Sequence, residues 1–284
     1  MKYTWYFDRV RIGNFKVSEE EMEEAEGRVS PALKEAIREA ARNIEAFHLK
    51  QLPGSCEYES GNGFRCWQEV RGIEKVGLYV PGGSAPLFST VLMLVIPARI
   101  AHCREIVICT PPDREGRVPP AILWAARYCG ATAVYKVGGV QAIAAMTFGT
   151  ETVPRVFKIV GPGNQYVTAA KRFAGNYGLA MDMPAGPSEV LIVADRTARP
   201  EYIAADLLSQ AEHGKDSQAV FVSWCPDMLE KVEKEVKRQI GLLPRCEIAR
   251  AAWENARFVV FENPEVCIQS VSYTHLTLPT KLEV

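Results

Sequence analysis

Residues 156–174 read VFKIVGPGNQYVTAAKRFA, and this stretch decides the fold class of the chain. The apolar, partly β-branched run 156–160 predicts a strand, and the segment 165–174 predicts a helix. Between them, Gly161 and Gly163 predict a short turn. A strand that passes through such a turn into a helix is half of a βαβ unit, so the stretch predicts an α/β fold.

The same alternation of strand and helix extends along the chain from residue 76 onward. Six further runs are predicted as strands: 76–80, 106–110, 132–137, 190–194, 219–223 and 258–261. Further helices are predicted over 119–129, 141–148, 200–213 and 227–240. The pattern is typical of parallel sheets that are covered by helices on both faces. Seven strands could form one wide sheet or two smaller ones, and their spacing does not decide between these arrangements.

The composition is that of a globular protein with balanced charge. The 284 residues include 33 Lys and Arg against 34 Asp and Glu, a net charge of -1. This balance lacks the positive field that drives nonspecific binding to nucleic acid, so we expect no nucleic-acid partner. The longest apolar run, 85–96, is followed by Pro97 and is well short of the roughly 20 residues that cross a bilayer. We therefore predict a buried helix there and no membrane partner.

The eight cysteines are scattered and include no C-x-x-C pair. With no secretory leader at the charged N-terminus, this pattern predicts reduced thiols and a cytoplasmic location. Cys109 lies in an apolar predicted strand and Cys129 ends a predicted helix, so both are expected to be small core residues.

Two helices are predicted before the first strand. Ser18 followed by Glu21 matches a capping box, and Ser30 followed by Pro31 matches the start of a second helix. Apolar residues at helical spacing in the second helix predict one stripe that docks on a larger body: Leu33, Ile37, Ala40, Ile44 and Phe47.

Three predicted strands end in glycine-rich turns, at 79–84, 137–141 and 160–165. Glycine lets the backbone approach a ligand, and the N–H groups that open the following helix point at an anion, which suits a pyrophosphate. The alternative is that glycine only permits tight turns between strand and helix. Gly161 and Gly163 match the start of the G-x-G-x-x-G fingerprint, but Tyr166 stands at its third glycine, so the fingerprint itself fails.

The segment 209–214, SQAEHG, brings together two further polar side chains. Gln210 and His213 are three residues apart, which on a helix places an amide oxygen and an imidazole on one face, and Gly214 is suited to end that helix. The two side chains could share a metal, although zinc normally takes three or four ligands. A histidine that caps the helix or is hydrogen-bonded is the alternative.

The segment 182–189, DMPAGPSE, is too rich in proline and glycine to be regular. Ser188 and Glu189 come just before the predicted strand 190–194. Polar side chains at such a turn either cap it or face a ligand, and both interpretations stay open.

These motifs, from VGLYVPGGSAPL at 76–87 through GPGN at 161–164 to the segments 182–189 and 209–214, resemble the histidinol dehydrogenase family in order and spacing. The resemblance covers about residues 7–270. It implies a zinc-dependent, homodimeric enzyme of histidine biosynthesis that oxidises L-histidinol to L-histidine in two NAD-linked steps. It also implies Rossmann-like parallel sheets in two domains, with residues 81–188 inserted into a discontinuous first domain of residues 1–80 and 189–270.

The resemblance also assigns roles to single residues. The NAD contacts of the family fall on Tyr79, Gln141 and Asn164, each beside one of the glycine turns. The substrate-contacting serine matches Ser188. Two zinc ligands match Gln210 and His213, which thereby also contact the substrate. In this family the zinc orients the substrate, while the nicotinamide carries out the redox step.

The end of the chain departs from the pattern of the family. After Ile268 the family continues with an Asn-x-x-x-Pro-Glu-His block, whose Glu and His are the acid–base pair, whereas residues 271–284 read VSYTHLTLPTKLEV. His275 lacks the preceding Glu, so no catalytic role is assigned to it. We expect this tail not to belong to the family, since it resembles translated vector or misassembled sequence. Two hypotheses follow: a working dehydrogenase, or an inactive fragment that binds dinucleotide only.

Overall fold

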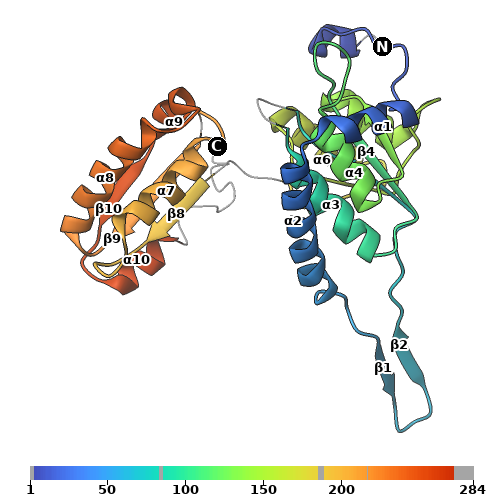
Figure 1. Cartoon of the computed structure of the whole chain (residues 1–284). Coiled ribbons are helices and arrows are strands. Elements are labelled where there is room, and N and C mark those ends of the chain that lie inside the picture. Colours follow the sequence, from blue (N-terminus) through green and yellow to red (C-terminus); the bar gives the residue numbers. More distant parts are fainter. Residues whose placement is uncertain (1–2, 83–85, 185–188, 216, 272–284) are drawn as a thin grey trace. The chain divides into compact units, whose positions relative to one another are not determined.

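The computed structural model describes residues 3–82, 86–184, 189–215 and 217–271. The chain divides into two compact units, Met1–Ala185 and Gly186–Val284 (Figure 1). Ser188 and His275 lie outside the described residues.

The first unit contains a five-stranded parallel sheet. Its strands are β3 (Lys75–Tyr79), β4 (Glu105–Thr110), β5 (Ala133–Lys136), β6 (Lys158–Val160) and β7 (Ala180–Met181). Their spatial order is β5-β4-β3-β6-β7, and every neighbouring pair is parallel. The chain therefore adds β4 and β5 on one side of β3, then crosses back to add β6 and β7 on the other side. This is the order of a Rossmann-like, doubly wound sheet, whose winding reverses between β3 and β6.

Helices cover both faces of this sheet (Figure 1): α3 (Phe88–Ile100), α4 (Pro120–Cys129), α5 (Gly139–Phe148) and α6 (Gln165–Gly175). Successive strand residues alternate between the two faces. Leu78 and Ile108 share a core with α3 and α4, whereas Val107 and Cys109 share a core with α5 and α6. The predicted buried helix around 85–96 is α3, which continues through Pro97 for one further turn.

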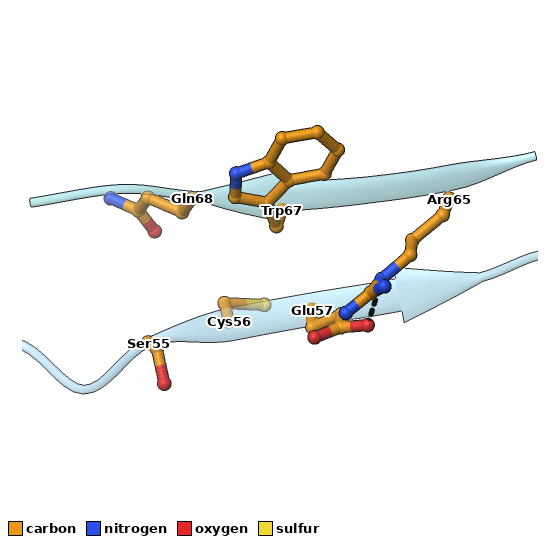
Figure 2. Close-up of a pocket in the computed structure, with 6 residues that line it drawn as sticks. All are labelled: Ser55, Cys56, Glu57, Arg65, Trp67 and Gln68. Atoms are coloured by element: carbon orange, nitrogen blue, oxygen red, sulfur yellow. Dashed lines mark ion pairs between the residues drawn. The ribbon is translucent and has the colours of Figure 1, made fainter.

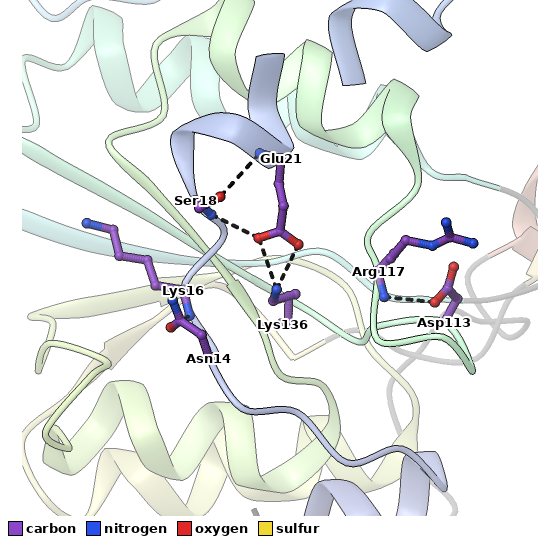
Figure 3. A network of polar contacts seen from close by, with 7 residues as sticks. All are labelled: Asn14, Lys16, Ser18, Glu21, Asp113, Arg117 and Lys136. Carbon is purple, nitrogen blue, oxygen red and sulfur yellow. Dashed lines mark hydrogen bonds and ion pairs between the residues drawn. The ribbon is translucent and has the colours of Figure 1, made fainter. Parts of the chain in front are cut away.

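Two N-terminal helices, α1 (Glu19–Arg28) and α2 (Pro31–Leu49), pack on α4 and α3. The predicted capping box of Ser18 and Glu21 is confirmed, as is the N-cap Ser30. Figure 3 shows that the Glu21 carboxylate also accepts hydrogen bonds from the Lys136 ammonium, at 2.8 and 3.0 Å. This ion pair ties α1 to the end of β5.

The predicted apolar stripe on α2 is only partly correct. Ile37 is buried and packs in the core, but Ala40 and Phe47 are exposed, and Ala41 is buried instead. Leu33 and Ile44 are half-buried and pack against the same core, so the buried line runs along residues 33, 37, 41 and 44 and does not include the last turn.

An antiparallel hairpin, β1 (Cys56–Glu59) with β2 (Arg65–Gln68), leads from α2 towards β3 (Figure 1). Every residue of both strands is exposed. Neither this hairpin nor the π-helical turn Thr4–Asp8 near the N-terminus was predicted from the sequence.

The second unit has a three-stranded parallel sheet in the order β10-β9-β8. Its strands are β8 (Glu189–Val193), β9 (Gln218–Ser223) and β10 (Arg257–Val260). Its helices are α7 (Pro200–Ala211), α8 (Pro226–Ile240), α9 (Cys246–Trp253) and α10 (Pro264–Val271). Leu207, Phe221 and Val232 join α7, β9 and α8 in one buried core.

The structure thus confirms an α/β fold with parallel sheets and resolves the seven predicted strands into two sheets. Cys109 and Cys129 are buried, as expected, and burial raises the pKa of the Cys129 thiol to about 11. In the described part of the chain, no helix is long and apolar enough to span a membrane.

The expected domain boundary after residue 80 falls between β3 and β4, which are paired in one sheet. The first compact unit instead ends at Ala185. The return of residues 189–270 to a discontinuous first domain stays a prediction.

Candidate functional site

The turns that follow β3, β5 and β6 lie together at the carboxyl ends of the strands of the five-stranded sheet. All three strands are parallel, so their carboxyl ends meet at the same edge. In doubly wound sheets, ligands bind outside these ends, at the point where the winding reverses. Here that point is between the ends of β3 and β6, at Tyr79 and Gly161.

Pro111, which follows β4, packs so closely against Gly82 and Gly138 that neither position has room for a side chain. A Cβ added to Gly82 would lie 2.4 Å from Cγ of Pro111, and one added to Gly138 would lie 2.4 Å from its Cβ. The backbones of the β3 and β5 turns therefore close around one proline ring.

The two glycines after β6 are also explained by neighbouring protein atoms. Gly161 has a φ of +127°, and a Cβ there would lie 2.2 Å from the carbonyl oxygen of Tyr79. A Cβ on Gly163 would lie 2.4 Å from Cγ1 of the buried Val167. Tight turns are therefore sufficient to explain these glycines, and any case for a ligand depends on the polar groups beside them.

Tyr79, a predicted NAD contact, ends β3 with its ring buried. Its phenol oxygen accepts a hydrogen bond of 3.0 Å from the backbone N–H of Gly139, at the start of α5. Burial is the main cause that raises the pKa of this phenol, so it keeps its proton at neutral pH. The phenol can therefore donate that proton to a second partner.

Gln141, the second predicted contact, lies in the first turn of α5 and is half-buried. A Cβ on Gly139 would lie 3.1 Å from Oε1 of Gln141. The Gln141 amide therefore lies beside Gly139, the residue whose backbone N–H bonds to Tyr79. The structure thus brings Tyr79 and Gln141 together at the start of one helix.

Asn164, the third predicted contact, is the exposed N-cap of α6. Its Oδ1 accepts a hydrogen bond of 3.0 Å from the N–H of Val167, as an N-cap residue should. The acceptor of this side chain is therefore used by the helix, while its NH₂ group carries two donors.

An ion pair between the buried Lys171 and the half-buried Asp182 lies beside Gly161 and was not predicted. Asp182 Oδ2 accepts a hydrogen bond of 2.7 Å from the Gly161 N–H, and Lys171 Nζ donates one of 2.9 Å to the Gly161 carbonyl. Lys171 Nζ also pairs with Asp182 Oδ1. The signal in the sequence was a lysine at helical spacing from Val167 and Ala174, on the buried side of α6.

Gln210 and His213 belong to the second unit, and their predicted helix ends early. α7 ends at Ala211, so His213 lies beyond the helix and Gly214 does not terminate it. The backbone N–H of His213 donates to the carbonyl of Gln210 at 3.1 Å, with His213 exposed and Gln210 half-buried. The prediction that one helix face presents both side chains is therefore wrong.

These two side chains do not complete a zinc site. An amide oxygen and an imidazole nitrogen are possible zinc donors, but they supply at most two of the three or four protein ligands that zinc takes. Among the residues that the structure describes, no group of three or more His, Cys, Asp or Glu side chains could hold a metal ion.

A separate open hollow lies on the β1–β2 hairpin (Figure 2). Its lining residues are Ser55, Cys56, Glu57, Arg65, Trp67 and Gln68. Glu57 and Arg65 form an ion pair, and the Trp67 ring is exposed. None of the predicted site residues lines this hollow.

The strand order and the turns at the switch point define the chain as an α/β protein of the Rossmann-like, doubly wound class. The sequence model of histidinol dehydrogenase matches residues 1–282, so the chain belongs to the histidinol dehydrogenase family. This match extends past Ser270, after which we expected the chain to depart from the family.

Known relatives agree with this assignment. The chain is 53% identical over 269 residues to histidinol dehydrogenase of Bacteroides thetaiotaomicron, covering 95% of the chain and 63% of the relative. It is 48% identical over 285 residues to that of Escherichia coli K12, covering 99% of the chain and 65% of the relative. A crystal structure of histidinol dehydrogenase from Elizabethkingia anophelis matches with a TM-score of 0.91 and 52% identity, covering 94% of the chain and 62% of the relative. The chain thus spans less than two thirds of the length of these relatives.

Proposed function

We propose that this chain takes part in the oxidation of L-histidinol to L-histidine, in two successive NAD-linked steps of histidine biosynthesis. One observation carries the proposal: the first unit has a Rossmann-like strand order with polar groups at its switch point, in a chain 53% identical to a histidinol dehydrogenase. The nicotinamide of a bound NAD supplies the hydride chemistry. The residues of this chain bind and orient the reactants.

In this proposal, NAD binds at the carboxyl edge of the five-stranded sheet. The Tyr79 phenol, the Gln141 amide and the NH₂ of Asn164 donate hydrogen bonds to it. Val167 already donates its N–H to Asn164, so the earlier N–H groups of α6, those of Gln165 and Tyr166, are the ones suited to a phosphate. The placement is supported by the shared position of Tyr79 and Gln141 at the start of α5.

We also propose that Ser188, Gln210 and His213 contact the substrate, and that Gln210 and His213 are two ligands of a zinc ion. When bound, such a zinc would orient the substrate rather than take part in hydride transfer. Such a zinc would need at least one further protein ligand, and no group of three or more His, Cys, Asp or Glu side chains that could hold a metal ion occurs among the described residues.

Cytoplasmic location and pairing with a second copy are part of the same proposal. The location is inferred from the scattered cysteines, and the pairing from the resemblance to the family. The balanced charge of -1 supports a small-molecule substrate rather than a nucleic-acid partner.

A second candidate function is dinucleotide binding without turnover. It is favoured by the first unit, which has its own buried cores and contains all three proposed NAD contacts. The Asn-x-x-x-Pro-Glu-His block of the family does not occur in residues 269–284. General acid–base groups typically contribute about 10²–10⁴-fold to the rate, so without them oxidation would be very slow.

One assay separates the two candidates. NADH formation from histidinol and NAD is measured for the 284-residue chain and for a chain extended after Ser270 with a family-type continuation. We expect NADH from the extended chain and none above background from the chain as given. Zinc-dependent turnover by the chain as given would rule out the second candidate, and an extended, folded chain without turnover would contradict the first.

A further inference from the structure

We propose that Lys171 and Asp182 are positioning residues that hold the turn after β6 in the conformation that binds the dinucleotide. This inference rests on the proposed binding of NAD at the switch point. Neither residue is proposed to touch NAD; both act through the backbone of Gly161.

Lys171 and Asp182 together bond both backbone polar groups of Gly161, its N–H and its carbonyl. Asp182 accepts the N–H of Gly161 at 2.7 Å, and Lys171 donates to its carbonyl at 2.9 Å. The Lys171 side chain is only 6% exposed, and its charge is balanced by Asp182. A buried charge with a fixed partner holds its neighbours in one arrangement, because moving away would leave it unpaired.

Gly161 is a position where the backbone needs such a restraint. Its φ of +127° is open to glycine, and glycine has the widest choice of other conformations. The ladder pairing of β3 with β6 ends at Val160, so Gly161 lies beyond the regular sheet. The side chains of Lys171 and Asp182 therefore replace the sheet as the source of its hydrogen bonds.

The pair also joins the segments that flank the proposed site. Lys171 lies on α6, whose N-terminus faces the proposed phosphate position, and Asp182 directly follows β7. Through Gly161, both are connected to the end of β6. A shift of any one segment would therefore move the turn relative to the start of α6.

The chain offers a matched control in Lys136 and Glu21 (Figure 3). Lys136 is 8% exposed with a partner 33% exposed, against 6% and 28% for Lys171 and Asp182. Lys136 points to the same face of β5 as Val134, which packs in the core of α3 and α4. The proposed contacts lie on the other side: Gln141 belongs to α5, Asn164 is the N-cap of α6, and the Tyr79 ring packs in the core of these two helices. Lys136→Met should therefore cost stability without moving the turn after β6.

The experiment measures NAD binding by calorimetry for the full chain, Lys171→Met, Asp182→Asn and Lys136→Met, well below the melting temperature of each. Hydrogen exchange of the peptide 158–167 is followed in the same proteins. We expect Lys171→Met to weaken NAD binding by about tenfold, equivalent to ~1.4 kcal/mol, and to speed exchange in this peptide. Asp182→Asn keeps an acceptor for Gly161 and should weaken binding less. Lys136→Met should bind within about twofold of the parent.

Folded Lys171→Met that binds NAD as tightly as Lys136→Met would overturn the inference and leave the proposed function intact. If Lys171→Met does not fold, Asp182→Asn is compared with Lys136→Met instead. Weaker NAD binding by Asp182→Asn would support the inference, and equal binding would overturn it. A folded parent without saturable NAD binding would instead overturn the proposed function, and this inference with it.

Discussion

Gly161 lies directly against the main chain of Tyr79: a Cβ on Gly161 would be 2.2 Å from the Tyr79 carbonyl oxygen. Tyr79 is the last residue of β3 and Gly161 follows β6, and these two strands are far apart in sequence but adjacent in the sheet. Their contact lies at the switch point of the Rossmann-like sheet, where the ends of β3 and β6 meet. The proposed NAD contacts on α5 and α6 are positioned around it.

This contact predicts the cost of a side chain at residue 161. Gly161→Ala should lower the free energy of unfolding by roughly 3 kcal/mol, because it combines an unfavourable φ with a backbone clash. Gly178→Ala is the control, since Gly178 has a φ of +76° but open space around its Cβ position. It should cost only roughly 1 kcal/mol. Urea denaturation measures both, and equal losses would show that the clash with Tyr79 is absent.

Asn164 is predicted to have two separable roles. Asn164→Ala removes the N-cap of α6 and should cost about 1 kcal/mol of stability, whereas Asn164→Ser keeps a cap and should cost little. Both variants lose the NH₂ group, so both should weaken NAD binding to a similar extent. Thermal unfolding and NAD titration are measured in parallel. Normal NAD binding by Asn164→Ser would mean that the side chain is only a cap.

The buried phenol of Tyr79 predicts a specific alkaline sensitivity. Its folded pKa is raised above the ordinary value, mainly by burial, so the folded state holds this proton more tightly than the unfolded state. The resulting stability is complete below about pH 10 and is lost as the pH rises through the folded pKa. The melting temperature of the parent should therefore fall more steeply above pH 10 than that of Tyr79→Phe. Parallel curves for the two proteins would contradict a raised pKa at Tyr79.

Zinc retention is predicted to be poor in this chain. Gln210 is a neutral, weak donor and His213 is exposed, so the pair should not hold zinc through exhaustive dialysis. Metal analysis after dialysis should find far less than one zinc per chain, and His213→Ala should not lower that amount further by much. Stoichiometric zinc in the dialysed parent would contradict this prediction and show that residues of this chain complete a zinc site.

The strands could be predicted because burial on both faces leaves a strong signal. In β4, for example, Ile106, Val107 and Ile108 alternate between two cores, so the whole run is apolar. The β1–β2 hairpin leaves no such signal, since all its residues are exposed. β7 has only two residues, which is too short for any periodicity.

The candidate site was predicted where a local motif carries it, and missed where it depends on tertiary contacts. The glycine turns at Gly82, Gly138 and Gly161 are visible in the sequence, but their neighbours Pro111 and Tyr79 are not. The pairing of Lys171 with Asp182 joins a helix to the segment after a strand, and no local pattern connects them. The early end of α7 was also missed, because Gly214 offered a plausible terminator three residues later.

Calorimetric titration of the purified chain with NAD tests the central claim most directly. We predict saturable binding to a single class of site, weakened in Asn164→Ser and Lys171→Met but not in Lys136→Met, with circular dichroism to confirm that each protein is folded. A folded parent that shows no saturable binding up to millimolar NAD would contradict the placement of the dinucleotide at the switch point between β3 and β6.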